Sequence, residues 1–396
     1  MANGATNILA ADSELVRKSW LQDKLVEKVS ESFWAPYVGM GSDNIVYQVN
    51  TSTAGDGHTV VFDYAGQLAG KAIKGKNTAA GQGVDKVKFS DKVTVDRYRF
   101  PVNNGDVFDA ISAGDLSSAA HSDSVNRLAD VWTRFKDQAL FDSAQGGLGE
   151  APTHIYSTTE SAFDYDELLK IEKAIKTGNG FKKPSTSGAV TTTAADVREP
   201  LKPFKLIDGK PIWLLVLDTT MATALKSSAK YQSMAFNGDL RGNDNRAITG
   251  VIGKIGSFVI VEANSFFGTT DGTGEFDLED SEIDIAGLRQ YNTAGTINAT
   301  TPLGAWSGQT AFVASVPANI VSRGLVLGQG ALQLGMGKEP DYMLQESTDF
   351  KISSESAMEV YTGVKQTRLI QETGKGRSAK ITEIPFGIVA IDCINV

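Results

Sequence analysis

Two alternating segments that flank a glycine-rich stretch constrain the fold of this sequence most. Residues 59–68 (TVVFDYAGQL) and 86–100 (KVKFSDKVTVDRYRF) alternate apolar and polar side chains, which predicts two β-strands. The apolar set of the second strand is Val87, Phe89, Val93 and Val95. Residues 69–83 between them (AGKAIKGKNTAAGQG) are basic, rich in glycine and almost without large apolar side chains. Because an isolated two-stranded ribbon is marginal in water, we expect something outside the chain's own fold to hold this long hairpin.

Helical periodicity predicts four helices elsewhere in the chain. They are expected at residues 13–34, 115–142, 164–177 and 219–231. The second is the strongest, and its apolar stripe is Leu128, Val131, Trp132, Phe135 and Ala139. The third has a start typical of a capping box, with Asp164 and Glu167, and Gly178 follows its last turn.

Strand patterns dominate after residue 200. The predicted segments are 210–218, 257–264, 311–316, 323–336, 349–370 and 384–396. The first, KPIWLLVLD, is a continuous apolar run, which is typical of a strand covered on both faces. Cys393, the only cysteine, is expected to be a buried apolar residue of the last strand. A single cysteine excludes a disulfide framework and any Cys-based zinc or iron–sulfur site.

The stretch RGLVLGQGALQLGMGK, residues 323–338, has the glycine spacing of a phosphate-binding loop but lacks its other residues. Gly330 and Gly335 are five residues apart, yet Met336 stands where a P-loop needs lysine. The dinucleotide-binding fingerprint needs glycine or alanine at position 333, where Gln333 stands. Neither nucleotide-binding motif is met.

The alternation of this stretch predicts a bent strand instead. Leu325 and Leu327 have one parity, and the apolar residues after Gly330 have the other, so the apolar face switches across residues 328–330. A bulge or sharp bend produces such a switch. Gly335 and Gly337 then lie on the face opposite the apolar residues, where we expect another backbone to come close.

Composition and charge exclude several classes of protein. The 396 residues predict two or three domains, and the formal net charge of −9 disfavours a free-standing DNA-binding protein. The start of the chain, MANGATNILAADSE, lacks the features of a signal peptide, and the longest uncharged run, 290–322, is too polar to cross a bilayer. A soluble protein made in the cytoplasm is therefore expected.

Charge is also distributed unevenly. Residues 60–100 hold eight basic and four acidic side chains, whereas residues 262–284 hold eight acidic and no basic ones. Each cluster is either a solvated face or a surface that steers contacts between copies of the chain. The candidate contact residues are Lys71, Lys74, Lys76, Lys86, Lys88, Arg97, Arg99, Asp277, Glu279, Asp280, Glu282 and Asp284.

No catalytic or metal-binding motif emerges. The three histidines, His58, His121 and His154, do not form a metal-binding pair, and no nucleophile elbow occurs. The acidic stretch 271–284 offers oxygen ligands for calcium but does not match the EF-hand loop, so a solvated loop or partner surface is the better interpretation. Aromatic residues in the basic hairpin are better explained as strand residues than as a nucleic-acid platform. We expect no enzyme activity, cofactor or metal.

The order of segments resembles the major capsid proteins of tailed bacteriophages with the HK97 fold, and more narrowly the family of the phage N4 major capsid protein. The resemblance is carried by five segments: LADVWTRFKDQALFDSAQG (128–146), DGKPIWLLVLDTTMATALK (208–226), VIGKIGSFVIVEANSF (251–266), GLVLGQGALQLGMG (324–337) and KISSESAMEVYTGVKQTRLI (351–370). It implies an α+β fold. The implied parts are an N-terminal arm (1–58), an extended loop (59–102), a peripheral domain (103–200 and 341–396) with a long spine helix, and an axial domain (201–340).

The resemblance further implies a structural protein of the virion. Hexamers and pentamers would tile an icosahedral shell around double-stranded DNA, without sequence-specific DNA contacts and without a membrane. Partners would be a portal, a separate scaffolding protein and, in some phages, a decoration protein, with assembly in the host cytoplasm. Lysines of the extended loop form cross-links in the fold's best-known member, but no motif supports that reaction here, so we expect noncovalent assembly.

Two other hypotheses remain open. A β-rich surface or binding protein such as an adhesin would suit the Gly- and Thr-rich loops, although no export signal is present. An enzyme with a carboxylate site that no motif reveals is the other alternative.

Overall fold

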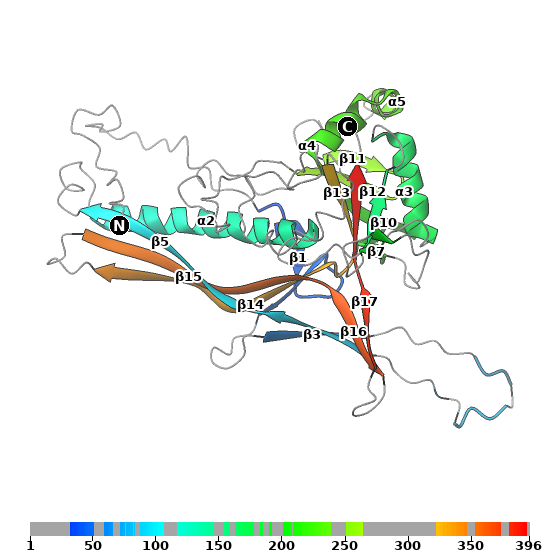
Figure 1. The fold of residues 1–396 in the computed structure, drawn as a ribbon, viewed down its shortest axis with the longest axis horizontal. Helices are drawn as coiled ribbons and strands as arrows, with labels where there is room; N and C mark the ends of the chain where they lie inside the picture. The colour runs from blue at the N-terminus through cyan, green and yellow to red at the C-terminus, as the bar shows by residue number, and fades with distance from the viewer. Residues whose placement is uncertain are drawn as a thin grey trace.

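The longest helix lies along one face of a long sheet, and both lead into a second, more compact region (Figure 1). The structure, a computed structural model, describes the following residues: 32–50, 59–65, 72–75, 77–81, 83, 88–106, 117–145, 154–158, 163–177, 183–184, 190–191, 201–207, 209–238, 251–263, 322–346, 353–373 and 380–393. Within them the chain forms three main sheets and four α-helices. The expected α+β class is confirmed.

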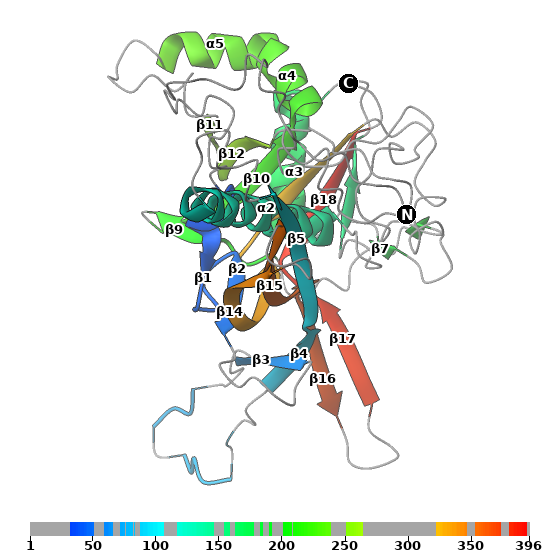
Figure 2. The same cartoon turned by 90° about the vertical axis from the view of Figure 1, so that its left-hand side faces the viewer.

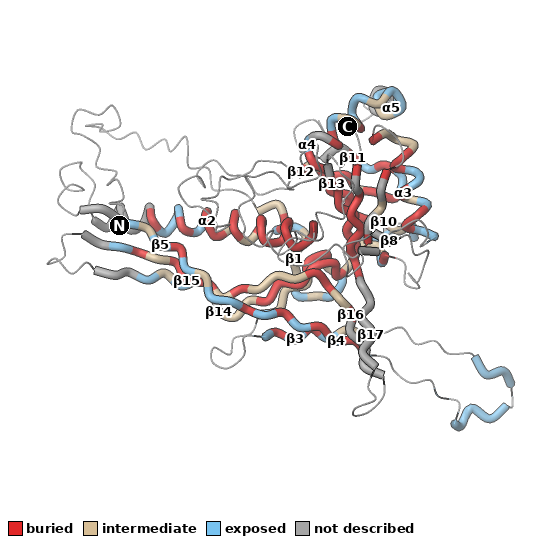
Figure 3. The backbone as a smooth tube through the Cα atoms, viewed as in Figure 1, coloured by how far each residue is buried: buried red, intermediate tan, exposed pale blue. Residues whose placement is uncertain are grey.

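Helix α2 (Ser117–Gln145) is the predicted strongest helix, and it covers the five-stranded sheet (Figures 1 and 3). The sheet order is β1 (Val38–Gly39), β2 (Val46–Asn50), β14 (Leu332–Glu346), β15 (Ser353–Gln366) and β5 (Asp96–Asp106). All five predicted stripe residues of α2 are buried, and four of them, Leu128, Val131, Trp132 and Phe135, pack on Phe100, Met358 and Val360 of the sheet. Each such side chain contributes ~1.5–3 kcal/mol through its burial.

The compact region is built on a seven-stranded sheet. Its order is β11 (Val251–Ile255), β12 (Phe258–Ala263), β10 (Lys210–Asp218), β13 (Ser322–Leu327), β18 (Ile388–Cys393) and β6 (Ile155–Ser157), with β9 (Lys205–Ile207) also paired to β10. Helices α3 (Tyr165–Thr177) and α4 (Thr219–Ser227) cover one face, and the C-terminal end of α2 reaches the other. β10 is central and buried, as its apolar run predicts, and Cys393 is buried in the last strand.

The predicted hairpin is present, but the chain itself holds its strands. β3 (Thr59–Ala65) and β4 (Lys88–Thr94) pair antiparallel, and β16 (Arg368–Thr373) and β17 (Lys380–Pro385) extend them into a four-stranded sheet. The expectation that something outside the chain's fold must hold the strands was therefore wrong. The C-terminal strands supply the missing neighbours, a long-range pairing that the local pattern does not reveal. A small separate ribbon pairs β7 (Lys183–Pro184) with β8 (Val190–Thr191).

The glycine stretch is a bent strand, as predicted. β13 ends at Leu327 in the seven-stranded sheet, and β14 starts at Leu332 in the five-stranded sheet. Gly330 has a φ of 63°, a conformation that glycine adopts without strain. The expected close backbone at Gly335 and Gly337 was wrong, because side chains of Val60, Val95 and Tyr361 approach them instead.

The fourth predicted helix is broken into two. α4 ends at Ser227, and α5 (Ala229–Gly238) continues beyond the expected end at Tyr231. Ser228 has an extended ψ of 132°, and its hydroxyl accepts a hydrogen bond from the Tyr231 N–H (3.3 Å). Serine thus caps the second helix, a role that competes with continuing the first. Figure 2 shows α4 and α5 at the end of the molecule opposite the four-stranded sheet.

Some expectations fall on residues outside the described ranges. These are the first helix up to residue 31, the strand at 311–316 and the acidic stretch 271–284. At the end of the expected first helix, Phe33 and Trp34 form a turn that leads into a 3₁₀ helix, η1 (Ala35–Tyr37). None of the helices in the described part of the chain is long and apolar enough to cross a membrane.

Candidate assembly surfaces

The four-stranded sheet has one buried face and one open face. Val60, Phe62, Val93 and Val95 are buried against side chains of β2 and β15, which include Tyr47 and Tyr361. The other face of β3 and β4 is exposed at every alternate residue, from Thr59 to Ala65 and from Lys88 to Thr94. Lys88 and Lys92 lie on this open face, in register with Ala65 and Val61. Asp63 lies on the same face opposite Ser90, so the open face carries two lysines and one carboxylate.

The tip of the hairpin extends away from the rest of the molecule (Figures 1 and 3). Every described residue between 72 and 83 is exposed, including Lys74. Ile73 is one of few exposed large apolar side chains, with 37% of its surface accessible. Lys71, Lys76 and Lys86 lie outside the described residues. A projecting basic tip with an exposed isoleucine is suited to contact another molecule.

Arg97 and Arg99 of β5, both candidate contact residues, differ in their surroundings. Arg97 makes an ion pair with Glu359 of β15 and lies 6.0 Å from the centre of the Tyr361 ring. The hydrogen bond to Glu359 raises the pKa of the Arg97 guanidinium. Arg99 is exposed, and no described residue forms an ion pair or hydrogen bond with it. Arg97 thus has a role within the chain, whereas Arg99 has no partner among the described residues. The five predicted acidic residues, from Asp277 to Asp284, lie outside the described ranges.

Asp91 is a buried anchor that the sequence analysis missed. Its carboxylate accepts hydrogen bonds from Lys365 Nζ (2.7 Å), the Arg368 N–H (2.9 Å) and the Lys92 N–H (2.8 Å). These contacts tie β4 of the hairpin to the junction of β15 and β16. A signal existed, because Asp91 has the same parity as Phe89 and Val93, the apolar side of its strand.

A second buried carboxylate fastens the end of the N-terminal segment to α2. The Ser32 hydroxyl and the Phe33 N–H donate to the two oxygens of Asp137, at 2.7 and 2.6 Å. Phe33 and Trp34 pack on Phe141 of the same helix, with ring centres 4.9 Å apart in both pairs. Burial raises the pKa of Asp137, although these hydrogen bonds act in the opposite direction. These contacts fix residues 32–34 against α2.

Side chains from two sheets hold the last turn of α2. Arg323 of β13 is fully buried and donates from Nη1 to the Gln145 carbonyl (3.0 Å). Gln366 of β15 donates from Nε2 to the Ser143 carbonyl (2.6 Å). The last carbonyls of a helix lack partners within it, and a cation there also interacts favourably with the helix dipole. The end of α2 is therefore hydrogen-bonded to both large sheets.

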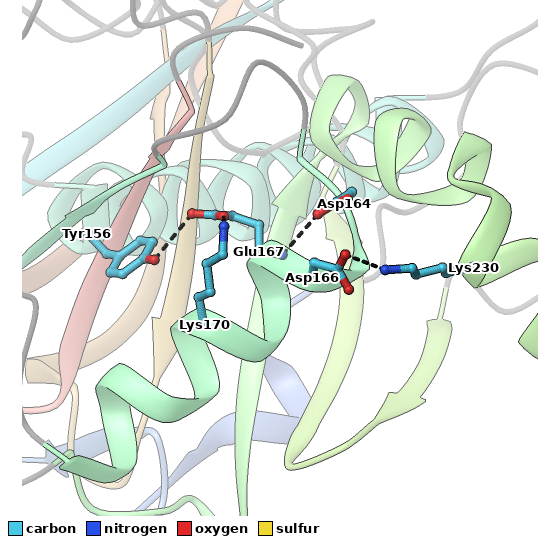
Figure 4. Close-up of polar contacts among 6 residues, drawn as sticks. All are labelled: Tyr156, Asp164, Asp166, Glu167, Lys170 and Lys230. Carbon is cyan, nitrogen blue, oxygen red and sulfur yellow. Dashed lines mark hydrogen bonds and ion pairs between the residues drawn. The ribbon is translucent and has the colours of Figure 1, made fainter.

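Polar contacts around α3 hold the compact region together (Figure 4). Asp164 accepts from the Glu167 N–H (2.9 Å), which caps the helix as predicted. Glu167 does not complete a reciprocal capping box in the described contacts, because its buried carboxylate accepts from Tyr156 of β6 (3.2 Å) and Lys170 (2.8 Å). Asp166 forms an ion pair that links α3 to Lys230 of α5. These acids are engaged in structural contacts, and the described residues contain no group of three metal-ligating side chains.

Comparison with known proteins identifies the family to which this chain belongs. The sequence pattern of the family described as "Phage capsid protein" matches residues 9–396. No curated protein matches the chain. Among solved structures, the capsid of Ralstonia phage GP4 is similar with a TM-score of 0.64 and 15% sequence identity, and the match covers 98% of both chains.

Two other capsid structures have the same fold. The Helicobacter pylori bacteriophage KHP30 capsid gives a TM-score of 0.59 at 15% identity, covering 96% of this chain and 93% of the other. The cyanophage Pam1 capsid gives 0.55 at 14% identity and covers 100% of both chains. At these identities the structures support the fold, which is of the HK97 type. Because the family pattern spans nearly the whole sequence, the chain belongs to the phage capsid protein family.

Proposed function

We propose that this chain is the major capsid subunit of a tailed phage, and that its copies assemble as hexamers and pentamers into an icosahedral shell around double-stranded DNA. The full-length match to the capsid family carries this proposal. The subunit's shape supports it, because a long sheet, a spine helix and a projecting basic hairpin offer several separate surfaces to neighbours. The narrower resemblance to the phage N4 capsid family is part of the proposal.

The proposed division into arm, extended loop, peripheral domain and axial domain follows the sheets, with some boundaries moved. The axial domain is centred on the seven-stranded sheet, and β14 leaves that sheet at residues 328–330. We therefore end the central axial segment there and not at residue 340. The seven-stranded sheet also includes β6 and β18, so part of each peripheral segment contributes to the axial core.

The proposed inter-subunit contacts join the basic hairpin of one copy to the acidic segment of another. The available cations are the lysines of residues 71–88 together with Arg99, and the anions are the carboxylates of residues 277–284. Opposite charges on two different segments of one chain favour contacts between the basic segment of one copy and the acidic segment of another, and they disfavour contacts between like segments. Such contacts weaken as salt concentration rises.

The proposed partners are a separate scaffolding protein, a portal and, in some particles, a decoration protein. The net charge of −9 supports a container that encloses DNA without sequence-specific binding, because a strongly basic wall would retain the genome. Assembly takes place in the host cytoplasm, is noncovalent and needs no cofactor. The subunit has no enzymatic activity in this proposal.

Sedimentation velocity and negative-stain imaging of the purified chain, alone and with a co-expressed scaffolding protein, test the proposal. Shells or capsomers are the expected products. A chain that stays monomeric in both conditions, and whose melting temperature rises with a ligand, would instead support the alternative of a β-rich binding protein.

A further inference from the structure

Two strands leave the five-stranded sheet together and enter the four-stranded sheet. Val95 connects β4 of the four-stranded sheet to β5 of the five-stranded sheet, and Thr367 connects β15 of the five-stranded sheet to β16 of the four-stranded sheet. On one side of this corner, the last backbone pair is Thr362 with Asp96. On the other side, β16 meets β4 only at the pair Ile370 with Ser90. The backbone hydrogen-bond ladder between residues 88–106 and residues 353–373 is therefore interrupted at the corner.

Asp91 fills this interruption. One carboxylate oxygen accepts from Lys365 Nζ at 2.7 Å, and the other accepts from the Arg368 N–H at 2.9 Å. Lys365 Nζ also lies 3.4 Å from the Lys92 carbonyl. The side chain of Asp91 has no exposed surface, whereas that of Lys365 is 22% exposed. When the ion pair opens, Lys365 can reach water, whereas Asp91 stays buried with hydrogen bonds from the Lys92 and Arg368 N–H groups. Opening therefore costs free energy, and the closed pair is favoured.

The backbones touch beside this contact. A Cβ atom on Gly363 of β15 would lie 1.9 Å from the carbonyl oxygen of Thr94, so no side chain fits between the two strands. Across the sheet, Gly335 faces methyl groups of Val60 and Val95. Val60, Phe62, Val93 and Val95 pack beside these glycines against Tyr47 and Tyr361, and Asp91 adds the buried polar contact to this apolar packing.

We propose that Asp91 and Lys365 form a latch that fixes the angle of the hairpin sheet against the five-stranded sheet. With the ion pair closed, β4 is held to the junction of β15 and β16. With it open, β3 and β4 move about the contact between Gly363 and Thr94. In the assembled particle, a consequence that rests on the proposed function, this angle decides where the hairpin tip meets the neighbouring copy.

Hydrogen–deuterium exchange of the purified full chain tests the latch directly. The variants are Asp91→Asn, Lys365→Met and the double variant, and Lys92→Met is the matched control, because Lys92 is exposed on the same strand. We expect both single variants to raise exchange in 59–65 and 88–94 by about tenfold, with β13 and β18 unchanged. The double variant exchanges no faster than the faster single variant, because both changes break one contact.

Two results would overturn the latch. One is exchange in 59–65 and 88–94 that stays at the wild-type level in Lys365→Met. The other is a rise that is equal in β13 and β18, which is the signature of general destabilisation. If Asp91→Asn fails to fold, Lys365→Met decides alone. Failure of the wild-type chain to assemble would contradict the proposed function and leave the exchange result intact, so the two failures are distinguishable.

Discussion

Gly335 on β14 and Gly363 on β15 lie directly opposite each other, and both face the strands that cross over the five-stranded sheet. Their surroundings differ. A Cβ at position 335 would meet a methyl group of Val60 at 3.1 Å, whereas one at position 363 would meet the Thr94 carbonyl oxygen at 1.9 Å. The two glycines let the hairpin sheet pack closely on the five-stranded sheet, because neither has a side chain.

We predict that Gly363→Ala destabilises the subunit more than Gly335→Ala. A valine methyl group can shift by a few tenths of an ångström, but the Thr94 carbonyl belongs to a paired strand. The expected loss is ~2–3 kcal/mol at position 363 and less than ~1 kcal/mol at position 335. Denaturant unfolding of the two variants measures the difference, and equal losses would contradict the contact at Thr94.

Arg323→Met should destabilise the junction between the two large sheets. The substitution fills a similar space but leaves the carbonyl of Gln145 without its donor. Leaving a buried acceptor unpaired costs ~1–3 kcal/mol, and Arg323→Lys should recover part of it because an ammonium group can also donate. Thermal unfolding of both variants checks this order, and a wild-type melting temperature for Arg323→Met would refute the role in joining the sheets.

The two arginines of β5 should separate stability from assembly. Arg97→Met removes a cationic partner of the buried Glu359 carboxylate and should lower the melting temperature of the subunit. Arg99→Gln should stay within ~0.5 kcal/mol of the wild type, because the side chain is exposed and without a described partner, and a neutral residue opposite Glu359 adds no like charge. Its effect should be slower assembly in light scattering at low salt. Wild-type assembly kinetics for Arg99→Gln would contradict an interface role for Arg99.

Stability should depend on pH through Asp137. Burial raises the pKa of its carboxyl in the folded state, so the folded chain binds the proton more tightly than the unfolded chain. The contribution is fully present below pH ~4, the ordinary value for aspartate, and is lost as the pH rises through the folded-state pKa. The stability of the wild type minus that of Asp137→Asn should therefore fall as the pH increases over this interval. A difference that grows with pH would mean that the hydrogen bonds outweigh burial.

Deleting Lys71 to Gln82 should leave the subunit folded and block shell formation. Every described residue of this stretch is exposed, so its loss should change the melting temperature little. Circular dichroism checks the fold, and negative-stain imaging checks assembly. Efficient shell formation by the deletion variant would contradict an interface role for the hairpin tip.

Local patterns predicted the elements that depend on neighbours in the sequence. The apolar stripe of α2, the buried run of β10 and the bend at residues 328–330 follow from periodicity within one segment. Periodicity could not predict the strand that pairs with the hairpin, because β16 pairs with β4 from the other end of the chain. Gly363 was missed for the same reason, since only the crossing of two strands distant in sequence brings Thr94 to it. Among the candidate contact residues, sequence could not separate Arg97 from Arg99, because the partner of Arg97 lies on β15.

The most direct test is a cryo-electron microscopy reconstruction of particles assembled from this chain. The account predicts a closed shell of hexamers and pentamers in which residues 69–83 of each subunit lie against a neighbouring copy. Particles in which this stretch folds back on its own subunit, or a preparation that contains only monomers, would contradict it.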